Sequence, residues 1–156
     1  MSGGILVNHP EYIVIHCSDS TWGDAREIDA WHKARGFDRI GYHHVILGGF
    51  RSYREMKDGD PNPCDDGRIE EGRKESDPGA HCAPHGMNFK SVGVCLIGSR
   101  GFFTPRQMEA LRALISRLRL KYGIPASKVV GHCEQDPKKP HCPGLDMAGL
   151  RKSLAL

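Results

Sequence analysis

The chain has 156 residues, of which 38% are hydrophobic and 26% are charged, and its formal net charge at pH 7 is +3. This length suits one domain with a single hydrophobic core, and so weak a positive charge does not indicate a nucleic-acid-binding protein. No run approaches the roughly 18 apolar residues of a membrane span, and the start of the chain lacks the pattern of a signal peptide. We therefore expect a monomer without membrane insertion that accumulates in the cytoplasm, where its six cysteines are thiols or metal ligands.

The first third of the chain predicts two strands separated by a helix. Residues 12–17 are apolar and β-branched, which is typical of a buried strand. Apolar residues recur at helical spacing over residues 25–35, and Gly36 ends this helix. Residues 42–47 predict the second strand.

The middle of the chain predicts two further strands between loops. Residues 48–67 are rich in glycine, proline and aspartate, which is typical of a surface loop. Residues 68–71 predict a short strand, and residues 75–90 a second loop. The apolar residues over 91–97 predict another buried strand.

The last third predicts a long helix, a strand and a terminal helix. Thr104 is a capping residue for a helix whose apolar stripe ends near Gly123. Residues 128–131 predict the last strand, and residues 146–154 a terminal helix. Strands interleaved with helices imply a single α/β domain with a central mixed sheet flanked by helices.

Three residues have side chains that suit a metal site. His16 ends one predicted strand, His132 ends another, and Cys142 lies in a Cys-Pro-Gly turn. Zinc prefers imidazole and thiolate ligands, and a catalytic zinc site has three protein ligands and one open position. Because successive side chains of a strand alternate, Cys17 and Cys133 are expected to point away from such a site. No local motif joins the three residues, so the residues alone leave a structural role open.

Eight dispersed segments carry a resemblance to a known family. They are residues 15–18 (IHCS), 26–33 (REIDAWHK), 41–44 (GYHH), 67–73 (GRIEEGR), 91–98 (SVGVCLIG), 103–108 (FTPRQM), 131–132 (GH) and 142–144 (CPG). In this order they resemble the type-2 N-acetylmuramoyl-L-alanine amidases, especially the short zinc amidase-type lysozymes (endolysins) of tailed phages. The similarity runs over about residues 12–150, which implies one amidase domain over residues 1–156 with a zinc cleft on one side of its sheet.

The resemblance also implies roles for individual residues. The zinc (Zn2+) ligands of the family fall on His16, His132 and Cys142, and its catalytic tyrosine falls on Tyr42. The catalytic lysine, which precedes the cysteine ligand, falls on Lys139, with Lys138 as the alternative. Strand alternation places His44 on the same face as Tyr42.

Two features concern the substrate. His81 lies in a segment similar to a family loop that lines the substrate groove, and Asn88 is close to it, so both residues are expected to bind substrate. The segment of residues 48–67 is longer than the segment that the short phage enzymes have between the corresponding two strands. We expect this insertion to be a tolerated surface loop, with a role in specificity as the alternative.

The activity implied is hydrolysis of the amide bond between N-acetylmuramic acid and L-alanine in peptidoglycan. A phage or prophage endolysin would remain in the cytoplasm until a membrane pore releases it to the wall. One alternative is a cytosolic enzyme that recycles anhydro-muropeptides, although that subfamily generally has an aspartate where Cys142 stands. The other is a non-catalytic peptidoglycan-recognition module, a class that typically lacks the cysteine ligand.

Overall fold

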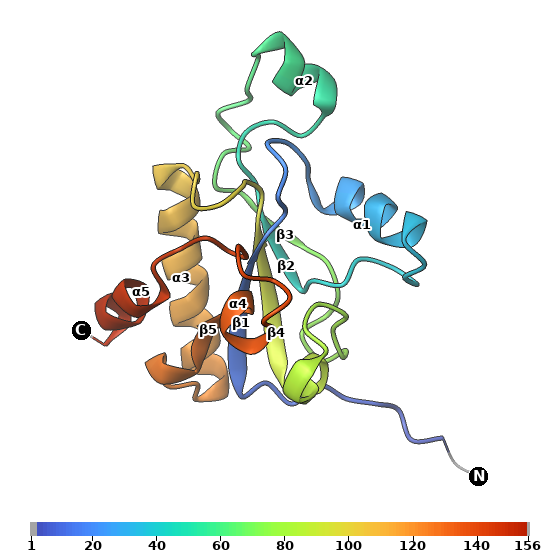
Figure 1. Cartoon of the computed structure of the whole chain (residues 1–156), viewed down its shortest axis with the longest axis vertical. Coiled ribbons are helices and arrows are strands. Elements are labelled where there is room, and N and C mark those ends of the chain that lie inside the picture. The colour runs from blue at the N-terminus through green and yellow to red at the C-terminus, as the bar shows by residue number, and fades with distance from the viewer. Residues whose placement is uncertain (1–2, 156) are drawn as a thin grey trace.

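The structure is a computed structural model that describes residues 3–155, and its centre is one five-stranded sheet (Figure 1). The strands are β1 (Tyr12–Cys17), β2 (His44–Ile46), β3 (Ile69–Glu71), β4 (Ser91–Leu96) and β5 (Val129–Gly131), in the spatial order β3–β2–β4–β1–β5. β1 pairs in parallel with β4 and β5, β2 pairs in parallel with β4, and β3 is antiparallel to β2. This mixed sheet confirms the predicted fold class.

Helices cover both faces of the sheet. They are α1 (Ala25–Ala34), α2 (Tyr53–Asp58), α3 (Pro105–Tyr122), α4 (His132–Gln135) and α5 (Met147–Leu154), with the 3₁₀ turns η1 (Pro84–Phe89) and η2 (Ala126–Lys128). In Figure 1, α3 and α5 lie on one side of the sheet and α1 on the other, while α2 stands at the upper end of the molecule. Over residues 3–155, no helix is long and apolar enough to cross a membrane.

The central strand β1 separates the main core from the face that carries the candidate site. Ile13 and Ile15 are fully buried in the core formed with α3 and α5. Val14 belongs to a separate small cluster, and His16 shares its face of the strand. Because side chains of a strand alternate, one strand supplies both the core and a polar group on the opposite face.

The helix α3 begins and ends where the sequence predicts. The Thr104 hydroxyl accepts a hydrogen bond from the Gln107 N–H, and the Gln107 side chain accepts one from the Thr104 N–H in return. This reciprocal capping satisfies N–H groups that have no partner inside the helix. At the other end, Gly123 has a φ of 67°, a left-handed conformation that glycine adopts without a Cβ clash.

Two of the predicted loops contain helices. The insertion at residues 48–67 holds α2, in which Ser52 and Glu55 form a capping box and Gly59 is the left-handed C-cap. The Ser-x-x-Glu pattern is the sequence signal for this helix, and the surrounding glycine and proline residues obscured it. Residues 75–90 likewise hold the turn η1.

The insertion is attached to the rest of the domain through Arg51. Its guanidinium donates hydrogen bonds of 2.9–3.0 Å to the carboxylates of Asp24, Asp65 and Glu70. The hydrogen bonds from Arg51 hold the pKa of Asp65 below its ordinary value. The insertion is therefore fixed to the start of α1 and to β3 by ionic hydrogen bonds.

Two leucines of α3 allow a matched test of the core. Leu118 is 0% exposed in the main core, whereas Leu120 is 88% exposed. We expect Leu118→Ala to lower the free energy of unfolding by about 2–5 kcal/mol, because it removes buried apolar contacts and leaves a cavity. The control Leu120→Ala is expected to change it by less than about 0.5 kcal/mol. Urea unfolding measures both, and equal effects of the two substitutions would contradict this packing of α3.

Candidate metal centre and active site

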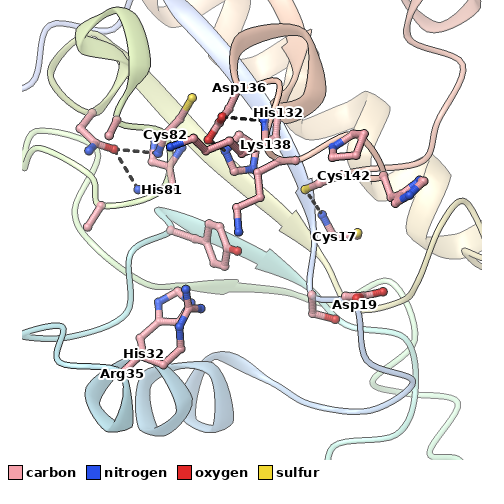
Figure 2. A pocket seen from close by; sticks show the side chains of 18 of the residues that line it. Cys17, Asp19, His32, Arg35, His81, Cys82, His132, Asp136, Lys138 and Cys142 are labelled. Carbon is pink, nitrogen blue, oxygen red and sulfur yellow. Dashed lines mark hydrogen bonds and ion pairs between the residues drawn. The ribbon is translucent and has the colours of Figure 1, made fainter.

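A cavity of about 560 Å³ opens on the side of the sheet that α1 covers (Figure 2). It lies at the carboxyl ends of two parallel strands, since Cys17 ends β1 and His132 directly follows β5. The end of α1, residues 80–83 and residues 138–142 complete its wall. Ligands of open α/β sheets bind at the carboxyl ends of the strands, so this position is typical of a functional cleft.

The structure brings together the three residues that the sequence singles out as metal ligands. One donor atom from each of His16, His132 and Cys142 lies within 4.8 Å of the others. His16 Nδ1 lies 3.1 Å from His132 Nδ1 and 3.9 Å from Cys142 Sγ. Zinc takes both imidazole and thiolate ligands, and three protein ligands leave one position open, so the group fits a zinc ion chemically.

The protonation of this group suits metal binding. Burial holds the pKa of His16 well below its ordinary value, with the nearby His81 and His132 adding to the effect, and burial also lowers the pKa of His132. Both imidazoles are therefore neutral near pH 7, as ligands must be. The adjoining Cys17 and burial raise the pKa of Cys142 in the metal-free protein. A bound metal deprotonates such a thiol outright.

Each of the three residues also has a polar partner behind it. His16 Nε2 lies 2.8 Å from His81 Nδ1, and His132 Nε2 lies 3.8 Å from a carboxylate oxygen of Asp136. The Cys17 N–H points at Cys142 Sγ over 3.4 Å, as the dashed line in Figure 2 marks. Hydrogen-bonded outer partners orient metal ligands and tune their basicity, a role that the geometry allows to His81 but not to Asp136, which lies too far from His132 for a hydrogen bond.

Strand alternation does not explain why His132 and not Cys133 is the candidate metal ligand. His132 does not end a strand but begins α4, so strand alternation does not apply to this pair. The expectation that Cys17 points away from the site also needs correction, because Cys17 borders the cavity at the end of β1. Over residues 3–155, the one cluster of metal-ligating side chains found is the group of His16, His132 and Cys142.

Tyr42 lines the cavity beside His16, and their ring centroids are 4.9 Å apart. Desolvation raises the pKa of the phenol well above its ordinary value, so the hydroxyl keeps its proton and can donate a hydrogen bond. The expectation that His44 shares its direction is wrong, since His44 bonds to Glu75 at 2.9 Å on the α3 side. The regular strand β2 begins only at His44, so alternation does not extend back to Tyr42.

Two buried histidines hold the segment around Tyr42. His32 Nδ1 accepts a hydrogen bond from the Gly41 N–H, and His43 Nδ1 accepts one from the Gly93 N–H, both at 2.9 Å. Each bond requires an unprotonated ring nitrogen. Burial lowers the pKa of both histidines below 6.5 and keeps them neutral.

Lys138 and Lys139 both line the cavity, in the turn that leads to Cys142. Asp136 fixes the base of this turn, because its carbonyl accepts from the Lys139 N–H and its carboxylate from the Lys138 N–H, each at 3.0 Å. The catalytic role of Lys139, with Lys138 as the alternative, stays a prediction.

His81 and Asn88 also line the cavity. The Asn88 side-chain oxygen accepts hydrogen bonds from the N–H groups of His81 and Cys82, at 2.8 and 2.9 Å. Asn88 therefore shapes the loop that carries His81. Contact of the two residues with substrate stays a prediction.

Sequence reasoning missed two arginines in the cavity wall. Arg35 follows α1, and Arg100 occupies a turn after β4 with a φ of 50°. Among the described residues, neither guanidinium is paired with a carboxylate, whereas Arg51, Arg73 and Arg151 are. No signal in the sequence distinguishes Arg35 and Arg100 from ordinary surface arginines.

Residues 7–145 match the protein family described as N-acetylmuramoyl-L-alanine amidase. The chain belongs to this family. Among its curated relatives, the endolysin of Escherichia phage T7 is 34% identical over 145 residues, which cover 86% of this chain and 81% of the relative. The resemblance noted in the sequence is thereby confirmed.

Solved structures of amidases and of peptidoglycan-recognition proteins share this amidase fold. The N-acetylmuramoyl-L-alanine amidase LysC from Clostridium intestinale URNW has a TM-score of 0.74 and 27% identity, covering 96% of this chain and 87% of that one. Drosophila PGRP-LB has a TM-score of 0.65 and 28% identity, with 96% and 87% covered. The fold is thus shared by proteins named as amidases and by proteins named for peptidoglycan recognition.

The neutral histidines around Tyr42 predict a loss of stability in acid. The folded pKa values of His32 and His43 lie below 6.5, so the unfolded chain binds more protons once the pH falls through that value. We expect the free energy of unfolding of the metal-free protein to have its highest value above about pH 7 and to fall as the pH is lowered toward about 5.

Urea titrations across this range check the prediction. His32→Gln is expected to flatten the profile, whereas the control His85→Gln, at an exposed position, leaves it unchanged. A wild-type free energy that is constant over the range would contradict the account.

Proposed function

We propose that this protein is a zinc-dependent N-acetylmuramoyl-L-alanine amidase that hydrolyses the amide bond between N-acetylmuramic acid and L-alanine in peptidoglycan. The observation that carries the proposal is the group of His16, His132 and Cys142, with donor atoms within 4.8 Å, beside a cavity whose wall contains His132 and Cys142. Three protein ligands leave one position of a tetrahedral ion for water or substrate. Membership of the amidase family supports amide hydrolysis as the reaction that takes place at this centre.

The chain's own residues supply the remaining chemistry. Zinc, when bound, lowers the pKa of a bound water to around 7 and polarises the substrate carbonyl. The Tyr42 hydroxyl, which keeps its proton, can donate a hydrogen bond to the oxygen that gains negative charge during hydrolysis. An ammonium group from Lys139, or from Lys138, would stabilise the same charge because both residues line the cavity.

The charges of the cavity wall favour an anionic substrate. Its cations are Arg35, Arg100, Lys138 and Lys139, and its carboxylates are Asp19 and Asp136. The Asp19 carboxylate already accepts a hydrogen bond from the Ser99 hydroxyl at 2.7 Å. Peptidoglycan carries carboxylates on its stem peptides, so an excess of unpaired cations would attract it.

The biological role that we propose is that of an endolysin, a monomer that is released through a membrane pore to degrade the host wall. The similarity to the T7 endolysin over most of both chains supports this role. A recycling enzyme for soluble anhydro-muropeptides is the alternative. A purely recognising module is disfavoured, because such a module needs neither the Cys142 thiol nor the Tyr42 hydroxyl beside it.

Zinc content tests the metal centre. The purified protein is expected to hold about one zinc ion per chain, and Cys142→Ala to lose it, because two histidines alone bind zinc weakly. The matched control is Cys64→Ala, since Cys64 is an exposed cysteine outside the cavity. Elemental analysis after dialysis gives the result. Full amidase activity in a metal-free preparation would rule out the mechanism.

Tyr42→Phe tests the role of the phenol. We expect turnover to fall about 10²–10³-fold, as for the loss of one donor to an oxyanion, while the zinc content stays unchanged. In the same assay, Lys139→Ala is expected to reduce turnover more than Lys138→Ala. Unchanged turnover of the Tyr42 variant would remove this residue from the catalytic group.

The choice of substrate separates the two enzyme roles. An endolysin is expected to clear suspensions of outer-membrane-permeabilised cells faster than it cleaves soluble anhydro-muropeptide at a matched concentration of amide bonds. Turbidity and chromatography of the released peptides measure the two rates. A clear preference for the soluble fragment would identify a recycling enzyme instead.

A further inference from the structure

A chain of hydrogen bonds leads from His16 through His81, which lines the cavity, to Ser91 and a main-chain carbonyl in the protein interior. His16 Nε2 lies 2.8 Å from His81 Nδ1, and His81 Nε2 lies 3.2 Å from Ser91 Oγ. Ser91 Oγ in turn lies 2.6 Å from the carbonyl oxygen of Met87. The exposed fractions of these four residues are 1%, 9%, 0% and 2%, in that order, so water has little access to the bonds.

The far end of this chain determines where each proton lies. The Met87 carbonyl can only accept, so the single hydroxyl proton of Ser91 is donated to it. Ser91 Oγ must then accept from His81, which places the His81 proton on Nε2. A neutral imidazole protonated on Nε2 has only a lone pair on Nδ1, and it therefore accepts the Nε2 proton of His16.

This arrangement of protons determines the state of His16 Nδ1, the atom that faces the metal centre. With its proton on Nε2, neutral His16 has its lone pair on Nδ1. That atom is the one 3.1 Å from His132 Nδ1 and 3.9 Å from Cys142 Sγ. The tautomer required for metal binding is thus set by a main-chain carbonyl three hydrogen bonds away.

We propose that His81 is a positioning residue of the metal centre, which with Ser91 fixes the tautomer and ring orientation of His16 before the ion binds. This inference rests on the proposed function, because it concerns the same centre. It differs from the substrate contact expected from the sequence. Both ring nitrogens of His81 are already bonded, so neither is left for a substrate.

The surroundings of His81 hold its ring in this one position. A Cβ at Gly79 would clash with His81 Cδ2, and a Cβ at Gly93 would lie only 2.6 Å from the same atom. Only glycine at both positions leaves room for the imidazole between the loop and β4. The ring of His43 packs edge-on against it with centroids 5.7 Å apart.

Zinc affinity, measured without substrate, tests the proposal. Competition with a chromophoric chelator is expected to show zinc binding about 10–100-fold weaker in His81→Ala, as for the loss of other outer partners of metal ligands. His81→Asn is expected to restore most of the affinity, because an amide oxygen can accept the His16 proton where Nδ1 does. The control is His44→Gln, which removes a buried histidine on the opposite face of the sheet.

Nitrogen NMR of the wild type gives a second readout that does not depend on any variant folding. Long-range proton–nitrogen spectra of the metal-free protein are expected to show His16 and His81 both protonated on Nε2. A proton on Nδ1 of His81 would overturn the proposal. A zinc affinity of His81→Ala within twofold of that of the wild type would also overturn it. If turnover of that variant were reduced at the same time, His81 would be assigned to substrate binding instead. A wild type that binds no zinc would instead overturn the proposed function, and this inference with it.

Discussion

The pairing of β1 with a strand on each side is the constraint on which the rest of the structure depends. Hydrogen bonds to β4 and β5 fix its register along both edges, so its side chains alternate without freedom to adjust. One face carries Ile13 and Ile15, which pack in the core against α3, and the other carries His16, which lies beside His132 and Cys142. Because β5 runs parallel beside β1, His132, which directly follows β5, lies next to His16. Sites positioned by rigid strands keep their geometry.

Burying several histidine rings costs desolvation free energy, which the surrounding hydrogen bonds offset. Imidazoles removed from water are tolerated when they are neutral and their nitrogens have partners. His43 meets this condition through the main chain, and His81 meets it through His16 and Ser91. The same low polarity that keeps the histidines neutral also strengthens any charge interaction inside the cavity. Stability and the proposed chemistry therefore depend on one network.

The sequence predicts most of the fold because its signals are local. Short runs of apolar and β-branched residues locate β1 and β4, and a capping threonine and a glycine bound α3. Helix α2 lies outside the predicted helices because its capping box stands among glycine and proline residues and its six residues are too few to add a periodic apolar pattern. The grouping of His16 with Cys142, 126 residues apart, came from family resemblance, because no local spacing encodes contacts between distant turns. Arg35 and Arg100 could not be found, since their place in the cavity depends entirely on tertiary structure.

The central claim is that two histidines and one cysteine of this chain hold a catalytic zinc ion, which distinguishes an amidase from a recognition module of the same fold. Zinc K-edge X-ray absorption of the loaded protein tests it most directly. The account predicts two nitrogen ligands at about 2.0–2.1 Å, one sulfur ligand at about 2.3 Å and one light-atom ligand from solvent. A zinc shell without sulfur, or with two or more sulfur ligands, would contradict the assignment of His16, His132 and Cys142.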